Sequence, residues 1–118
     1  MADELATQAD FLIVYIEEAH AVEEFAFSDN EYNLRKAKSL RDRIDAAKIL
    51  QAHVESLDMK QRVPLLVDGM DDDAMFAYGA RPERLYVFVD GVVAYQSNRG
   101  PYALDRADFE AKLRMLIA

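Results

Sequence analysis

The run Phe11-Leu-Ile-Val-Tyr-Ile16 is the longest strongly apolar stretch of the chain, and it decides where the core begins. It is continuous, β-branched and aromatic, which is typical of a strand buried on both faces. It is also far too short to cross a membrane. The sequence therefore predicts a buried strand at these residues.

A long helix is predicted from Ser39 to about Leu57. Ser39 with Asp42 three residues later resembles a capping box, which marks a helix start. The polar stretch 17–38 before it has no strong period and is interpreted as a long loop, a kind of segment that is usually functional. The apolar residues expected along one face of the helix are Leu40, Ile44, Ala47, Ile49, Leu50 and Val54.

A second strand and a short helix follow the long helix. Pro64-Leu-Leu-Val-Asp68 predicts the strand. Asp71-Asp72-Asp73 places carboxylates in the first turn of the short helix, where the helix dipole favours them, and Gly79 is its expected end. A calcium loop is the alternative interpretation of the three aspartates, but the glycine and closing glutamate of a hand-type site are missing.

The last part of the chain predicts a hairpin and a final helix. Asp90-Gly91 lies between the apolar runs 85–89 and 92–95 and is a strong signal for a two-residue hairpin. Asp105 is expected to cap a helix through Leu116, whose inward residues are Phe109, Leu113 and Leu116. Strands that alternate with helices and close in a hairpin predict an α/β fold with a mixed sheet.

Composition narrows the possible classes of protein. The chain has 118 residues and a net charge of −8, with 52% hydrophobic residues, which indicates one globular domain over residues 1–118. It contains no cysteine, which excludes disulfides, thiolate metal sites and a cysteine nucleophile. Acidic proteins with scattered basic residues bind nucleic acid poorly. We expect a soluble cytoplasmic domain with no membrane and no nucleic-acid partner.

Several segments of the chain match a known pattern in order and spacing. They are Asp10–His20, Leu40–Ala47, Val67–Asp71, Tyr78–Val87 and Gly100-Pro101. Together they resemble the iodothyronine deiodinases, a family of the thioredoxin and peroxiredoxin superfamily. The resemblance covers almost the whole chain. It implies a thioredoxin-like three-layer domain and reductive removal of iodine from an iodothyronine ring.

The sequence also departs from that family. Family members carry a further strand and a selenocysteine or cysteine loop before the strand that matches Phe11–Ile16. That missing strand lies centrally, between Phe11–Ile16 and Leu85–Val89, so two apolar edges would be left unpaired. We expect either a truncated reading of a longer protein, with an in-frame UGA codon read as a stop, or a homodimer that covers the missing strand. A second family histidine falls at Ala37 and is absent.

The resemblance assigns roles to four residues. It implies catalytic roles for His20 and Glu17, and substrate contacts for Tyr15 and Arg84. From the sequence alone, His20 could equally be hydrogen-bonded within a loop, and only one of Glu17 and Glu18 can face a site. Arg84 could hold a carboxylate or phenolate through paired hydrogen bonds, or form a surface ion pair.

The sequence is compatible with two functions. The preferred one is a deiodinase-like oxidoreductase domain that acts on a small aromatic or thiol substrate in its complete form. Because the chemistry needs a selenolate or thiolate, the 118 residues themselves are predicted to be inactive. The alternative is a non-catalytic binding or assembly module. No cofactor is predicted, and no metal, since Glu17-x-x-His20-x-x-Glu23-Glu24 is interpreted as a strand end and loop rather than a helix that presents ligands on one face.

Overall fold

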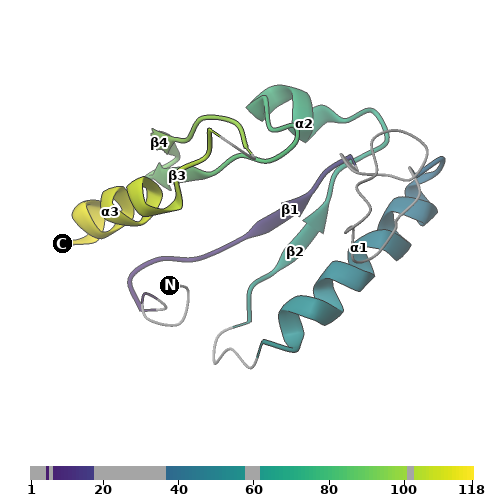
Figure 1. Cartoon of the computed structure of the whole chain (residues 1–118), viewed down its shortest axis with the longest axis horizontal. Helices are drawn as coiled ribbons and strands as arrows, with labels where there is room; N and C mark the ends of the chain where they lie inside the picture. Colours follow the sequence, from purple (N-terminus) through teal and green to yellow (C-terminus); the bar gives the residue numbers. More distant parts are fainter. Residues whose placement is uncertain (1–4, 6, 18–36, 58–61, 101–102) are drawn as a thin grey trace.

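The computed structural model describes residues 5, 7–17, 37–57, 62–100 and 103–118. Within these ranges the elements follow the predicted order of strands and helices (Figure 1). They are β1 (Ile13–Tyr15), α1 (Leu40–Glu55), β2 (Leu65–Val67), α2 (Asp73–Tyr78), β3 (Tyr86–Val89), β4 (Val92–Gln96) and α3 (Arg106–Ile117). The α/β class is therefore confirmed. The predicted loop over 17–38 lies almost entirely outside the described residues.

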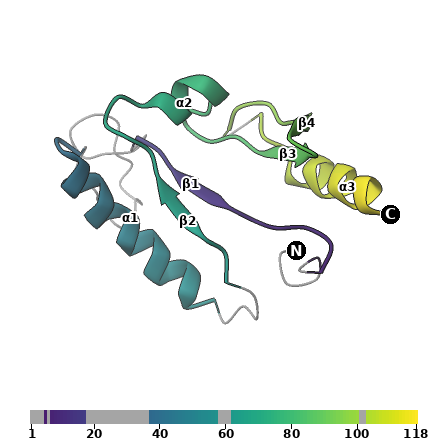
Figure 2. The ribbon, with the colours of Figure 1, turned by 180° about the vertical axis from the view of Figure 1, so that it is seen from behind.

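The described strands form two separate sheets rather than the single mixed sheet that the sequence predicted. β1 and β2 pair in parallel, and β3 and β4 pair antiparallel (Figures 1 and 2). Ile13 N–H donates to Pro64 O, and Tyr15 O accepts from Asp68 N. Because backbone groups alternate along a strand, Val14 directs its N–H and C=O away from β2. β1 and β3 belong to different sheets and do not pair with each other. They are the two strands between which the sequence analysis expected a strand of the family fold to be missing.

β1 is buried on one face only, and the prediction of burial on both faces was wrong. Leu12 is 57% exposed and Val14 is 42% exposed, next to Leu66 of β2 at 54%. Ile13 and Tyr15, which alternate with them, are half-buried. The reason is that a single helix, α1, packs beside this small sheet and can cover only one of its sides (Figure 1).

Helix α1 begins where the sequence predicted. Ser39 is its N-cap, and the Ser39 Oγ accepts a hydrogen bond of 3.1 Å from Asp42 N. The Asp42 carboxylate in turn accepts from Lys38 N at 3.2 Å. These bonds satisfy backbone donors that a helix start would otherwise leave unpaired.

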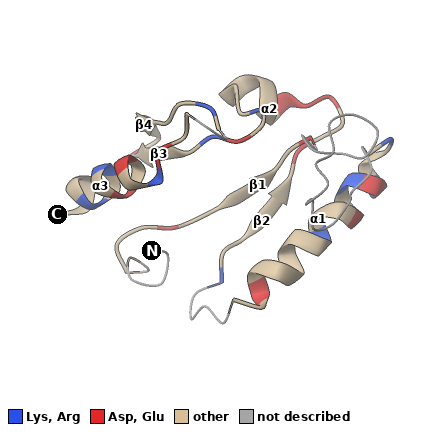
Figure 3. Cartoon of the chain, viewed as in Figure 1, with Lys and Arg blue, Asp and Glu red and all other residues tan. Residues whose placement is uncertain are grey.

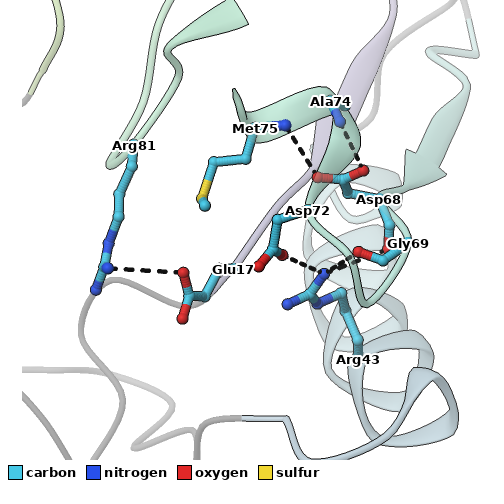
Figure 4. A network of polar contacts seen from close by, with 8 residues as sticks. All are labelled: Glu17, Arg43, Asp68, Gly69, Asp72, Ala74, Met75 and Arg81. Atoms are coloured by element: carbon cyan, nitrogen blue, oxygen red, sulfur yellow. Dashed lines mark hydrogen bonds and ion pairs between the residues drawn. The ribbon is translucent and has the colours of Figure 1, made fainter. Parts of the chain in front are cut away.

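The predicted apolar face of α1 is buried only in part. Ala47 is buried and Ile44, Leu50 and Val54 are half-buried, as expected, but Leu40 and Ile49 are exposed. Arg43 and Ala46, which were not predicted to face inward, are buried. Small residues let the helix lie close to β2, and the one charged residue among them is held by hydrogen bonds. Arg43 Nη1 donates to Gly69 O at 2.7 Å and pairs with Asp72 Oδ1 at 2.9 Å (Figure 4).

The hairpin and helix α3 form the second packing unit. Asp90 and Gly91 both have positive φ, 51° and 78°, which is the conformation that a two-residue type I′ turn requires. Asp105 caps α3 by accepting from Asp108 N, as predicted. Burial of Tyr95, with its hydroxyl donating to Asp108 Oδ2 at 2.9 Å and that carboxylate's charge beside it, raises the pKa of this tyrosine.

The core of this unit is built around Leu5, Val87 and Leu113. Phe109 packs against it as predicted, but Leu116 is 42% exposed and Ile117 packs in its place. Ile117 follows Leu113 by four residues, so it lies on the same helical face, one turn further on. Among the described helices, none is long and apolar enough to span a membrane.

Replacing Arg43 with methionine is expected to lower the free energy of unfolding by about 2–4 kcal/mol, because the Asp72 carboxylate and the Gly69 carbonyl lose a buried charged donor. Urea unfolding followed by circular dichroism measures the change. The matched control is Arg41→Met, since the Arg41 side chain is 79% exposed and its pairing with Asp45 is expected to contribute about 0.5 kcal/mol or less. Equal losses in both variants would contradict the structural role of Arg43.

Candidate functional site

The candidate site lies at the carboxyl ends of the parallel strands β1 and β2. Ligands of α/β proteins usually bind at this edge of a parallel sheet. β1 leads into Glu17, and β2 leads into Asp68, from which the chain continues to α2. Figure 4 shows Glu17, Asp68 and Asp72 around this edge, with Arg43 and Arg81 contributed by more distant parts of the chain.

Glu17, a predicted catalytic residue, is nearly buried and paired with an arginine. Its side chain is 9% exposed, and its Oε2 lies 3.6 Å from Arg81 Nη1. Arg81 is followed by Pro82 across a cis peptide bond. The structure thus brings the end of β1 against the proline segment that precedes β3. A sheltered carboxylate at this place can accept a hydrogen bond from a ligand.

The other predicted residues on this side of the chain are Tyr15 and His20. Tyr15 is the last residue of β1, is half-buried, and lies two positions before Glu17. His20 lies outside the described residues, as do Glu18 and the rest of the segment that could suggest metal ligands. The roles assigned to Tyr15, Glu17 and His20 remain predictions.

Arg84, the other residue predicted to contact substrate, binds backbone carbonyls. Its Nε donates to Ser97 O at 2.8 Å, and its Nη1 donates to Tyr78 O at 3.2 Å. Its guanidinium carbon lies 5.6 Å from the centre of the Tyr86 ring. Arg84 therefore ties the end of β4 to the end of α2. A substrate contact by Arg84 remains a prediction.

The short helix α2 is capped by a residue that the sequence analysis did not single out. Capping was predicted for Asp71–Asp73, but the two carboxylate oxygens of Asp68 accept from Ala74 N and Met75 N, each at 3.0 Å. Asp72 occupies the N-cap position without a side-chain cap bond, and its carboxylate binds Arg43 instead.

Two further residues of this region were missed by the sequence analysis. Arg81 had no signal beyond its place before Pro82. Arg43 had one, because it interrupts a helical face of small and apolar residues. In the part of the chain that the structure describes, no cluster of three His, Cys, Asp or Glu side chains is placed to hold a metal ion.

The acidic turn before α2 carries a perturbed carboxyl group. Coulombic repulsion from Asp71, and a hydrogen bond with it, raise the pKa of Asp73. A folded-state pKa that is raised means that the folded protein takes up this proton more readily than the unfolded chain. The contribution of Asp73 to stability is therefore largest at acid pH and is lost as pH rises through the folded-state pKa.

Replacing Asp71 with asparagine is expected to lower the pKa of Asp73 toward its ordinary value, because the repelling charge is removed. NMR titration of the Asp73 side-chain carboxyl carbon measures the shift. Asp45→Asn, on the exposed surface of α1, serves as the control and should leave the Asp73 titration unchanged. An unchanged Asp73 pKa in Asp71→Asn would show that the two carboxylates do not interact.

Replacing Arg84 with methionine is expected to destabilise the fold by about 1–3 kcal/mol, because the Ser97 and Tyr78 carbonyls lose a charged donor. Chemical unfolding measures the loss, and Arg114→Met is the control, since Arg114 pairs with Glu110 on the exposed surface of α3. If Arg84→Met unfolds at the same denaturant concentration as the unmodified chain, the carbonyl contacts contribute nothing to stability.

Comparisons with known proteins show the family to which the chain belongs. The family model for iodothyronine deiodinase matches residues 1–116. The chain is 42% identical to thyroxine 5-deiodinase from Sparus aurata over 101 residues, which cover 86% of this chain and 36% of that protein. Type I iodothyronine deiodinase from Xenopus laevis is 38% identical over 102 residues, which cover 86% of this chain and 38% of that protein.

The chain belongs to the iodothyronine deiodinase family, which confirms the resemblance inferred from its segments. Thyroxine 5-deiodinase from Sus scrofa is similarly related, at 41% identity over 92 residues, which cover 78% of this chain and 28% of that protein. The chain thus spans about a third of the length of these relatives, between 28% and 38%.

Proposed function

We propose that this chain is a thioredoxin-like domain that holds the substrate in a reductive deiodinase. The observation that carries the proposal is the Glu17–Arg81 pair, which places a sheltered carboxylate at the carboxyl end of a parallel strand and beside Arg81, the residue before Pro82. The family match over residues 1–116 supports the same assignment. The substrate class is an iodinated aromatic compound.

Reductive deiodination replaces a carbon–iodine bond with a carbon–hydrogen bond. A selenolate or thiolate takes the iodine, a proton takes its place on the ring carbon, and a thiol supplies the two electrons that finally release iodide. The 118 residues contain no cysteine, so we propose that they do not turn over alone. Their part is to bind and orient the ring through Tyr15, Glu17, His20 and Arg84.

A non-catalytic binding module is the second candidate. The presence of Ala37 where the family pattern has a histidine favours it. The thioredoxin-like scaffold hosts many functions, so the fold cannot separate the two candidates. A cytoplasmic location without cofactor or nucleic-acid partner remains a prediction under both.

A chimera separates the two candidates. The 101 matched residues of the Sparus aurata thyroxine 5-deiodinase are replaced with those of this chain, so that the relative supplies the remainder of its own length. Iodide release from thyroxine is then measured with excess dithiothreitol. We expect the chimera to release iodide and Glu17→Gln within it to slow release about 100-fold, as loss of a proton-transferring group does. Glu110→Gln, in the exposed surface of α3, is the matched control and should retain the rate.

Folding of each chimera is checked by circular dichroism and thermal unfolding. A folded chimera that releases no iodide would support the non-catalytic module and overturn the proposal. Equal rates for Glu17→Gln and Glu110→Gln would remove Glu17 from the site. The unmodified 118-residue chain is expected to release no iodide, and turnover by it would contradict the need for a selenolate or thiolate.

A further inference from the structure

The two arginines of the segment between α2 and β3 are held in different ways. Arg84 donates to backbone carbonyls of the fold, Ser97 O at 2.8 Å and Tyr78 O at 3.2 Å. Arg81, three residues earlier, extends toward the end of β1, where its Nη1 lies 3.6 Å from Glu17 Oε2 (Figure 4). Of these two cations, Arg81 is therefore the one that faces the carboxyl ends of the parallel strands.

Arg81 is the solvent-facing partner of its ion pair. The Arg81 side chain is 44% exposed, whereas the Glu17 side chain is 9% exposed. A guanidinium carries five N–H donors in a rigid planar fork, more than a single carboxylate can engage. An anionic group that approaches from solvent can therefore contact this guanidinium while Glu17 keeps its contact from the protein side.

The Glu17–Arg81 pair differs from the structural ion pair of the same region. Arg43 Nη1 lies 2.9 Å from Asp72 Oδ1, and the Arg43 side chain is 3% exposed. Direct charge-assisted hydrogen bonds span about 2.7–2.9 Å, so the 3.6 Å between Arg81 and Glu17 is a looser contact. Ion pairs that are loose and partly exposed contribute little to stability. The position of Arg81 thus suits a binding group better than a link that holds the fold.

We propose that Arg81 binds the carboxylate of an iodinated aromatic compound at this site. The inference rests on the proposed function, because it names the group that recognises one end of that substrate. A carboxylate fits the planar fork of a guanidinium well, since two parallel N–H···O bonds can form between them. Arg81 would then supply the cation of a site in which Glu17 supplies the anion.

The charge of Glu17 determines which carboxylates bind well. A ligand carboxylate and Glu17 would both contact Arg81, and two like charges at this separation repel each other. An α-amino acid carries an ammonium next to its carboxylate, and that positive charge offsets the repulsion. We therefore expect an iodinated aromatic amino acid to bind more tightly than the same compound without its amino group. A phenolate presents a single oxygen and no neighbouring ammonium, so it fits the pair less well.

Equilibrium dialysis of the 118-residue chain with three radioiodinated ligands tests the proposal. The ligands are thyroxine, the acid formed by removing its amino group, and the amine formed by removing its carboxylate. Arg81→Met is expected to weaken binding of thyroxine and of the acid about 10-fold, as loss of a hydrogen bond to a charged group does. Binding of the amine should not weaken, because it lacks the carboxylate and its ammonium is no longer repelled by the guanidinium.

Two companion variants complete the experiment. Arg81→Lys keeps the charge but loses the planar fork, so its affinity for thyroxine should fall between those of the unmodified chain and Arg81→Met. Arg41 pairs with Asp45 on the exposed surface of α1, and Arg41→Met is the matched control that should bind all the ligands as the unmodified chain does. Circular dichroism and thermal unfolding check the fold of each variant. If Arg81→Met does not fold, Arg81→Lys carries the test, since it too should weaken binding of thyroxine and the acid but not of the amine.

The outcomes separate this inference from the proposed function. If the unmodified chain binds thyroxine and the Arg81 variants weaken none of the ligands, the contact with Arg81 is overturned and the proposed function stands. If they weaken all the ligands equally, the guanidinium contacts the ring or the phenolate, and carboxylate recognition is overturned. If the unmodified chain binds none of the ligands, the proposed substrate-holding role fails, and this inference fails with it.

Discussion

The buried guanidinium of Arg43 is the contact on which the arrangement of the candidate site depends. It joins α1 to the turn after β2, through Gly69 O and Asp72 Oδ1 (Figure 4). That turn also contains Asp68, whose carboxylate holds the first N–H groups of α2. Since α2 leads directly to Arg81, the position of the cation beside Glu17 follows from how α2 is held. A charge this deeply buried is tolerated only because carbonyl and carboxylate oxygens replace water around it.

The division into two small sheets explains the unusual exposure of apolar side chains. Each sheet has one helix to cover one of its sides, so Val14 and Leu66 on one sheet and Phe88 on the other remain exposed. The charged residues are also unevenly distributed. Acidic residues lie at the turn before α2, and basic residues lie in the segment that follows it (Figure 3). Open edges and uncovered faces are surfaces on which further chain can pack.

Two residues in the segments that resemble the family, Glu17 and Arg84, have different partners in the structure. The segments in common with the deiodinases include Glu17 and Arg84, and both are held by specific partners in the structure. Glu17 faces an arginine at the edge of the sheet, whereas Arg84 is occupied by carbonyls that belong to the fold. The contribution of each to chemistry is a separate question from its contribution to stability.

The sequence by itself determined the order of elements, their caps and the hairpin, because these depend on local chemistry: Ser39 and Asp105 accept from their own helices, and Asp90-Gly91 adopts positive φ. It could not determine that Arg43 is buried, that Leu40 and Ile49 stay exposed, or which carboxylate caps α2. Those features depend on contacts between residues that are distant in the sequence. Arg43 is buried because oxygens 25 to 29 residues away surround it. The partition of strands into two sheets, and the meeting of Glu17 with Arg81, were likewise decided only by tertiary structure, since pairing partners distant in sequence leave no periodic signal in the chain.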